Sequence, residues 1–169
     1  MTVSCQKCVL DTNDYPDLII DENGICSICH TYDKLAKKTL YTPEEAKKQL
    51  SIIVNKIKES GKNKEYNCIL GLSGGVDSSY MAYLAKQWNL NPLVVHVDNG
   101  WNTELAVHNI KHLVNKLNFD LYSHVINWEE VKDIQRAFIK SSVLDIELPF
   151  DNAFFASLFM IAKKYKLKH

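Results

Sequence analysis

The stretch from Cys68 to Ser79 reads CILGLSGGVDSS, and it decides the fold of this 169-residue chain. Its apolar first half predicts a buried strand, and the residues from about Asp77 onwards predict the start of an amphipathic helix. The glycine pair between them predicts a tight turn whose backbone N–H groups can surround an anion at a helix N-terminus. The turn is not the Walker A pattern, because no lysine follows the glycines.

Strands and helices alternate outwards from this turn. Hydrophobic runs predict strands at 67–72, 92–98 and 120–126. Helical periodicity predicts helices at 43–60, 77–88, 106–117, 128–140 and 152–166. Thr42-Pro43-Glu44-Glu45 has the form of a capping box at the start of the first of these helices, and Asp151 is a candidate cap for the last. The alternation predicts an α/β fold with a doubly wound parallel sheet, in which ligands bind beyond the carboxyl ends of the strands.

The overall composition excludes some classes of function. The chain has 20 basic and 20 acidic residues, so no global positive field indicates nucleic-acid binding. It has no apolar run of 18 residues and no signal-peptide pattern, so we expect no membrane partner and a cytoplasmic location. Thiols stay reduced there, which favours metal binding over disulfides for clustered cysteines.

Four of the five cysteines form two Cys-x-x-Cys pairs, Cys5/Cys8 and Cys26/Cys29, with 17 residues between the pairs. This spacing is typical of structural Zn²⁺ sites, in which four thiolates close a tetrahedral shell. An iron–sulfur cluster and two disulfides remain open, as does replacement of one ligand by His30. We therefore predict a zinc-knuckle module over residues 1–40, and we find no extended periodic segment in its first 35 residues or so. Cys68 lies in an apolar strand and is expected to be buried.

The word SGGVDSS after a strand resembles the PP-loop of ATP pyrophosphatases, which split ATP into AMP and pyrophosphate. A wider resemblance, to the N-acetyl sugar amidotransferase family, covers nearly the whole chain in register. The matching segments are the Cys-x-x-Cys-Val-Leu-Asp-Thr opening and residues 21–29, 71–80, 94–102 and 145–154. Members of that family run well past 169 residues, so the resemblance implies a PP-loop domain over 41–169 that is incomplete at its C-terminal end.

The resemblance implies a specific reaction. The family is expected to adenylate an acetamido oxygen with ATP and Mg²⁺, after which ammonia displaces AMP to give an acetamidino sugar. The ammonia would come from a separate glutaminase subunit, and the products would serve surface glycans such as lipopolysaccharide O-antigen or flagellin decoration.

Chemistry and position together suggest the site residues. The expected phosphate ligands are Ser73, Gly74, Gly75, Ser78 and Ser79, and the expected adenine neighbours are Leu72 and the backbone at His96 and Val97. Three aspartates are candidates for catalysis or metal binding: Asp77, Asp98 and Asp151. Helix capping is the alternative for Asp77 and Asp151, and turn formation for Asp98. Trp101 can stack on a ligand or serve packing alone.

Two other functions stay open. One is a PP-loop enzyme that thiolates or otherwise modifies a tRNA base, although the neutral charge and the lack of further cysteines near the loop disfavour it. The other is a truncated module that binds ATP without turning it over. Nucleotide binding without AMP formation would favour the second.

Overall fold

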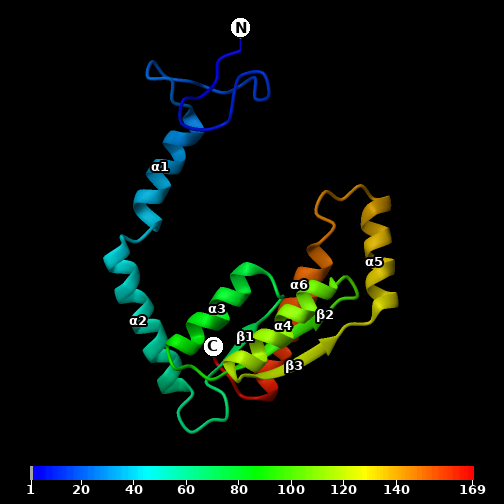
Figure 1. Ribbon diagram of the computed structural model, residues 1–169. Coiled ribbons are helices and arrows are strands. Elements are labelled where there is room, and N and C mark those ends of the chain that lie inside the picture. The colour runs from blue at the N-terminus through cyan, green and yellow to red at the C-terminus, as the bar shows by residue number, and fades with distance from the viewer. Residues whose placement is uncertain (1) are drawn as a thin grey trace. The chain divides into compact units, whose positions relative to one another are not determined.

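The computed structural model describes residues 2–169, and the chain divides into two compact units, Met1–Leu50 and Ser51–His169. The division falls inside a helix, α2 (Pro43–Ser60), which begins just after the boundary predicted at residues 40 and 41. The other helices are α1 (Ser27–Thr39), α3 (Val76–Gln87), α4 (Glu104–Leu117), α5 (Trp128–Lys140) and α6 (Leu148–Lys164), and the strands are β1 (Cys68–Gly71), β2 (Pro92–Asp98) and β3 (Asp120–Val125) (Figure 1).

The first unit is held by short pairings around its cysteines. Antiparallel bridges join Ser4 to Asp11 and Ile20 to Cys26. The helix α1 then begins directly after Cys26, whose Sγ accepts a hydrogen bond from the backbone N–H of Cys29. Our expectation that the first 35 residues or so carry no extended periodic segment was therefore wrong. Cysteine is not one of the usual helix-capping residues, so no start signal was recognisable at this position.

The capping box predicted at the start of α2 is present. The Thr42 hydroxyl accepts a hydrogen bond from the backbone N–H of Glu45, at 3.3 Å between Oγ1 and N. In return the Glu45 carboxylate accepts one from the backbone N–H of Thr42, at 2.9 Å. Two N–H groups that the first helical turn would leave without partners are satisfied in this way.

The sheet of the second unit has three parallel strands in the order β1-β2-β3. The predicted strand at 92–98 matches β2, and the predicted strands at 67–72 and 120–126 each contain the observed one. In the register, Gly71 at the end of β1 lies opposite Val95 of β2. The parallel arrangement brings the carboxyl ends of all three strands to one edge, where the glycine-rich turn follows β1.

Helices cover both faces of this sheet, which confirms the doubly wound α/β fold (Figure 1). On one face, α3 and α4 pack on Leu72 and the fully buried Val94. On the other face, Ile161 of α6 packs against Val95. Because successive residues of a strand point to opposite faces, the run Val94-Val95 serves both cores.

One expectation about the C-terminal segment needs correction. The helix α6 begins at Leu148 with Glu147 as its capping residue, so Asp151 lies in the first turn and is not the cap. Within α6, Phe155 is 58% exposed, whereas Ile161 is buried. Beyond α6 the chain returns to the sheet, and the carbonyl of His169 accepts a hydrogen bond from Ile69 of β1 at 2.8 Å. No helix within residues 2–169 is long and apolar enough to cross a lipid bilayer.

Candidate functional site

The turn after β1 has a backbone conformation that needs glycine. Gly74 has a φ of +82°, in the left-handed region that residues with a Cβ rarely adopt. A Cβ at this position would lie 2.5 Å from the backbone oxygen of Ala106 in α4. Gly75 differs, because its φ of −77° is ordinary and a Cβ there would approach only the Ser73 hydroxyl, at 3.4 Å. The loop thus runs close against the start of α4 at Gly74 alone.

Hydroxyl groups tie the loop to the first turn of α3. The Ser78 hydroxyl accepts a hydrogen bond from the backbone N–H of Ser73 at 3.2 Å, and the two hydroxyls lie 3.0 Å apart. Ser79 donates to the carbonyl of Gly75 at 2.7 Å. These bonds close the loop around the N-terminus of α3, where the helix dipole favours an anion.

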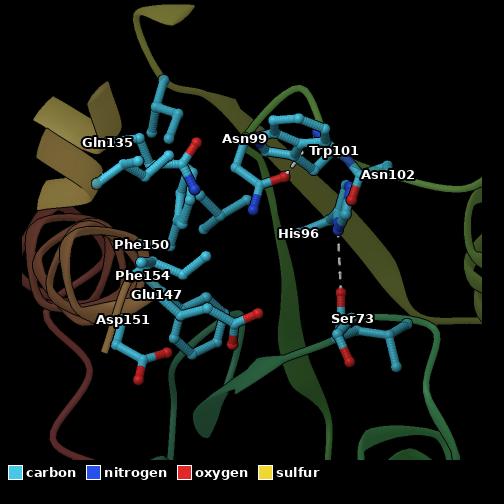
Figure 2. A pocket seen from close by; sticks show the side chains of 15 residues that line it. Ser73, His96, Asn99, Trp101, Asn102, Gln135, Glu147, Phe150, Asp151 and Phe154 are labelled. Atoms are coloured by element: carbon cyan, nitrogen blue, oxygen red, sulfur yellow. Dashed lines mark hydrogen bonds between the residues drawn. The ribbon is translucent and has the colours of Figure 1, made fainter. Parts of the chain in front are cut away.

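A cavity of about 750 Å³ lies beside this loop. It is lined by Leu72, Ser73, His96, Val97, Asn99, Trp101, Asn102, Ile126, Gln135, Ile139, Ile146, Glu147, Phe150, Asp151 and Phe154. Figure 2 shows Ser73 and His96 on one side, and Glu147 with the α6 residues Phe150 and Phe154 across from them. A Cβ at Gly71 would collide with the ring of Phe154, so the close approach of α6 to β1 depends on glycine there as well.

The structure brings most of the predicted site residues to this region. Leu72, Ser73, His96, Val97 and Asp151 line the cavity itself. The remaining loop residues, Gly74, Gly75, Ser78 and Ser79, lie at its border through the bonds just described. Their roles toward phosphate and adenine stay predictions.

The carboxylates differ in their surroundings. Asp77 is exposed in the first turn of α3, and no hydrogen bond or ion pair of residues 2–169 involves its carboxylate. The Asp98 carboxylate accepts hydrogen bonds from the backbone N–H of Gly100, at 3.0 Å, and from the Asn102 side chain, at 2.8 Å. These bonds fit the turn-forming role of Asp98, while its role toward metal or substrate stays a prediction.

The loop that follows β2 carries aromatic surface into the cavity. Trp101 lines the cavity, is 62% exposed, and meets Trp128 edge-on with ring centroids 5.6 Å apart. Gly100 has a φ of +81°, and a Cβ there would lie 2.8 Å from the Trp128 ring. Trp101 therefore packs on Trp128 and still exposes ring surface that a ligand could contact.

Several lining residues were not among our candidates. They are Asn99, Asn102, Ile126, Gln135, Ile139, Ile146, Glu147, Phe150 and Phe154. Asn99 and Asn102 follow a strand that ends at the binding edge, and this placement was a usable signal. Gln135 and Ile139 are one turn apart on α5, and nothing in the local pattern indicates that α5 faces the loop.

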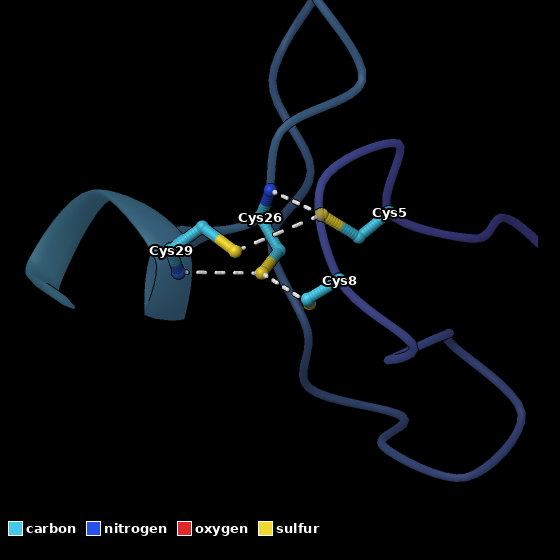
Figure 3. A group of neighbouring side chains, drawn as sticks. All are labelled: Cys5, Cys8, Cys26 and Cys29. Atoms are coloured by element: carbon cyan, nitrogen blue, oxygen red, sulfur yellow. Dashed lines mark hydrogen bonds between the residues drawn. The ribbon is translucent and has the colours of Figure 1, made fainter. Parts of the chain in front are cut away.

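The four predicted cysteine ligands meet in the first unit (Figure 3). Their Sγ atoms all lie within 4.8 Å of one another. The Sγ atoms of Cys5 and Cys29 are 4.0 Å apart, and those of Cys8 and Cys26 are 3.7 Å apart. All five cysteines of the chain are free thiols, so the disulfide alternative finds no support.

Backbone N–H groups point at two of these sulfurs. Those of Lys7 and Cys26 each lie 3.4 Å from the Sγ of Cys5. Burial acts to raise the pKa of the Cys5 thiol, but these hydrogen bonds outweigh it and lower the pKa to about 6. Burial and the neighbouring sulfurs raise the pKa of Cys29 to about 12. The group of thiols thus stabilises one thiolate readily, and a cation is needed to hold four. Cys68 is buried in the second unit as expected, and burial raises its pKa to about 11.

Comparison with known proteins identifies the family. No curated protein matches the sequence. Among solved structures, the fold is similar to the NH3-dependent NAD synthetase from Campylobacter jejuni, with 22% identity and a TM-score of 0.50 over 72% of this chain and 53% of that one. An NMN synthetase from Francisella tularensis is 25% identical, with a TM-score of 0.47 over 75% of this chain and 52% of that one. The chain therefore spans about half the length of either. The family model for NAD synthase matches residues 45–151, more than half of the chain, and the chain belongs to that family.

Proposed function

We propose that this chain is the ATP-binding part of an amidotransferase that acts on an acetamido sugar. In the reaction, the acetamido oxygen attacks the α-phosphorus of ATP and pyrophosphate leaves. Ammonia then replaces AMP and leaves an acetamidino group. The observation that carries the proposal is the Ser73–Ser79 loop, which opens on a cavity whose lining within residues 2–169 includes no lysine or arginine.

The loop suits a reaction that releases pyrophosphate. Charge develops on the leaving group, and preorganised N–H donors at the start of α3 would stabilise it. The hydroxyls of Ser73 and Ser78 can turn toward phosphate oxygens, since their present partners are each other and nearby backbone. Asp77, exposed beside them, is placed to hold the Mg²⁺ that accompanies ATP.

The charges of the cavity favour a neutral acceptor group. Its lining residues include the carboxylates Glu147 and Asp151 and no lysine or arginine. These two carboxylates would repel a carboxylate acceptor, and no lysine or arginine among the described lining residues would compensate its lost hydration. An acetamido group carries no charge, and the side-chain amides of Asn99, Asn102 and Gln135 can hydrogen-bond it. The size of the cavity is that of an ordinary small-ligand site.

This charge argument separates the proposal from the family name. An NH3-dependent NAD synthetase is similar in fold to this chain, and ammonia as the nucleophile agrees with our proposal. In our proposal the two reactions differ in the group that ammonia converts. This group is an amide here and a carboxylic acid when NAD is made by amidation. We further propose a cytoplasmic enzyme for surface glycans, with a glutaminase subunit as the source of ammonia.

The cysteine site fits a structural Zn²⁺ ion. Tetrahedral geometry with Zn–S bonds of about 2.3 Å requires neighbouring sulfurs to lie about 3.8 Å apart. The measured pairs, at 3.7 and 4.0 Å, bracket this value. Cys5, Cys8, Cys26 and Cys29 would hold the ion with no open position, so it would support the fold of the first unit and take no part in the reaction.

The test of function uses the purified chain with ATP, Mg²⁺, ammonium chloride and one of two acceptors. The acceptors are UDP-N-acetylglucosamine and the nicotinic acid dinucleotide whose amidation gives NAD. We expect AMP and pyrophosphate with the acetamido sugar alone. AMP formation with the dinucleotide alone would refute the proposed acceptor, ADP would refute the PP-loop chemistry, and ATP binding without turnover would favour a non-catalytic module. Salt-sensitive binding of tRNA would favour the base-modifying alternative.

The test of the metal site is elemental analysis of the same preparation. We expect about one zinc per chain, lost when Cys26→Ser removes the most buried sulfur. Iron with visible absorbance would refute zinc. The matched control is Cys68→Ser, which changes a buried cysteine outside the cluster and is expected to leave the metal content unchanged.

A further inference from the structure

Among the described residues that line the cavity there is one histidine, His96. It lies near the carboxyl end of β2, is 9% exposed, and lines the cavity beside Ser73 (Figure 2). A histidine in a strand core is most often structural. Three observations on this ring point to a chemical role.

The first observation is its hydrogen bond. The Nδ1 atom lies 3.1 Å from the carbonyl oxygen of Leu72, the residue just before the loop. A carbonyl oxygen only accepts hydrogen bonds, so Nδ1 carries the proton. In the neutral ring, Nε2 then has a lone pair and no proton. The bond fixes the tautomer and the orientation of the ring together.

The second observation concerns Nε2 itself. Within residues 2–169, no fully buried side-chain nitrogen or oxygen lacks a hydrogen-bond partner, and the contacts of His96 include no bond to Nε2. Nε2 therefore keeps access to the cavity. The third observation is the lining, which offers Nε2 no lysine or arginine as a competing donor. Nε2 of His96 is therefore a nitrogen with a free lone pair, at the end of the cavity next to the Ser73–Ser79 loop.

We propose that His96 is the general base that accepts a proton from the attacking ammonia. The inference rests on the proposed function. The lone pair of ammonia forms a bond to the carbon of the adenylated acetamido group, and the C=N electron pair moves onto the sugar nitrogen. The resulting ammonium group gives one proton to Nε2. The C=N pair then re-forms, and the C–O bond breaks with its electron pair leaving on the AMP oxygen.

The assignment divides the reaction into a step that needs His96 and a step that does not. Adenylation moves no proton to Nε2, and amination does. His96→Asn keeps an N–H donor near the Leu72 carbonyl and has no group that accepts a proton. The matched control is His124→Asn, because His124 lies on the neighbouring strand β3 and does not line the cavity.

The experiment measures both steps on the full chain. Adenylation is followed as exchange of labelled pyrophosphate into ATP with UDP-N-acetylglucosamine, and amination as sugar product formed with ammonium chloride. We expect His96→Asn to exchange at close to the wild-type rate and to lose amination by about 10²-fold or more. Equal loss of both steps, or unchanged amination, would overturn the role of His96. Wild-type protein without acceptor-dependent exchange would instead overturn the proposed function, and this inference with it.

A second measurement does not depend on turnover or on a folded variant. Nuclear magnetic resonance of wild-type protein with isotope-labelled histidine nitrogens reports which ring nitrogen carries the proton. We expect a protonated Nδ1 and an unprotonated Nε2 for His96, with the signals assigned through its ring protons. A neutral ring with its proton on Nε2 would overturn the inference.

Discussion

Replacing Gly74 by alanine tests whether the loop conformation is as constrained as the structure indicates. The φ of +82° puts the new residue in the left-handed region, at a cost of about 1–2 kcal/mol. Its Cβ would also lie 2.5 Å from the Ala106 carbonyl oxygen, which belongs to backbone and cannot rotate away. Crowding of that kind costs about 1–3 kcal/mol more. We expect Gly74→Ala to lower the free energy of unfolding by about 2–5 kcal/mol in total.

The matched control is the neighbouring glycine. Gly75 has an ordinary φ of −77°, and its added Cβ would meet only a rotatable hydroxyl at 3.4 Å. Alanine is a poorer helix cap than glycine, but it also reduces the entropy of the unfolded chain, so the two effects nearly cancel. Gly75→Ala should therefore stay within about 1 kcal/mol of wild type.

Thermal unfolding followed by circular dichroism separates the two variants. For a chain of this size, each kcal/mol shifts Tm by about 2–4 °C, so Gly74→Ala should melt roughly 4–20 °C below wild type. The same scan with ATP and Mg²⁺ should show ligand stabilisation in wild type and little in this variant, because the loop must move to relieve the contact. If both variants melt together, the loop does not depend on the Gly74 conformation and the reasoning is refuted.

Three further changes test other parts of the chain. Burial and the hydrogen bond to Asp120 raise the pKa of Tyr66 in the folded protein. The stability that Tyr66 contributes is therefore complete below the ordinary tyrosine pKa and is lost as the pH rises through the folded-state pKa. Urea unfolding measured against pH should show this alkaline loss of stability in wild type and not in Tyr66→Phe. Thr42→Ala removes the hydroxyl that accepts a hydrogen bond from the Glu45 backbone N–H, and it should cost about 1 kcal/mol of helix stability. An unchanged midpoint of unfolding would contradict this expectation. Asp77→Asn should weaken ATP binding in Mg²⁺ and leave binding without Mg²⁺ nearly unchanged in calorimetry; an equal loss in both would assign Asp77 another role.

The regular parts of the fold were readable from sequence because local patterns and tertiary packing agree there. The strand at 92–98 and the helix at 128–140 have the predicted bounds. The start of α6 was not readable, because Glu147 caps it without a side-chain hydrogen bond and thus leaves no capping signature. The helix α1 was missed for a related reason, since its cap is the sulfur of a predicted metal ligand. Both errors lie at helix starts that lack an ordinary capping signature.

The candidate site was readable on its sheet side, and on its helix side only at Asp151. Ser73 and His96 follow from one rule, that parallel strands present their carboxyl ends to the ligand. Gln135 and Phe150 reach the cavity only because α5 and α6 return across the edge of the sheet. That return depends on contacts such as the Phe154 ring over Gly71, which neither residue's local sequence indicates.

The sheet side and the helix side of the cavity would serve different parts of the proposed reaction. The loop and the strand ends form the part of the cavity that would handle ATP, and the family match over residues 45–151 includes them together with α5, Glu147 and Asp151. The opposite wall, from α5 and α6, would meet the acceptor, and its charged groups are Glu147 and Asp151. Proteins of one fold can share the first part and differ in the second. We therefore base the proposed acceptor, a neutral amide, on the charge of that wall and not on the name of the family.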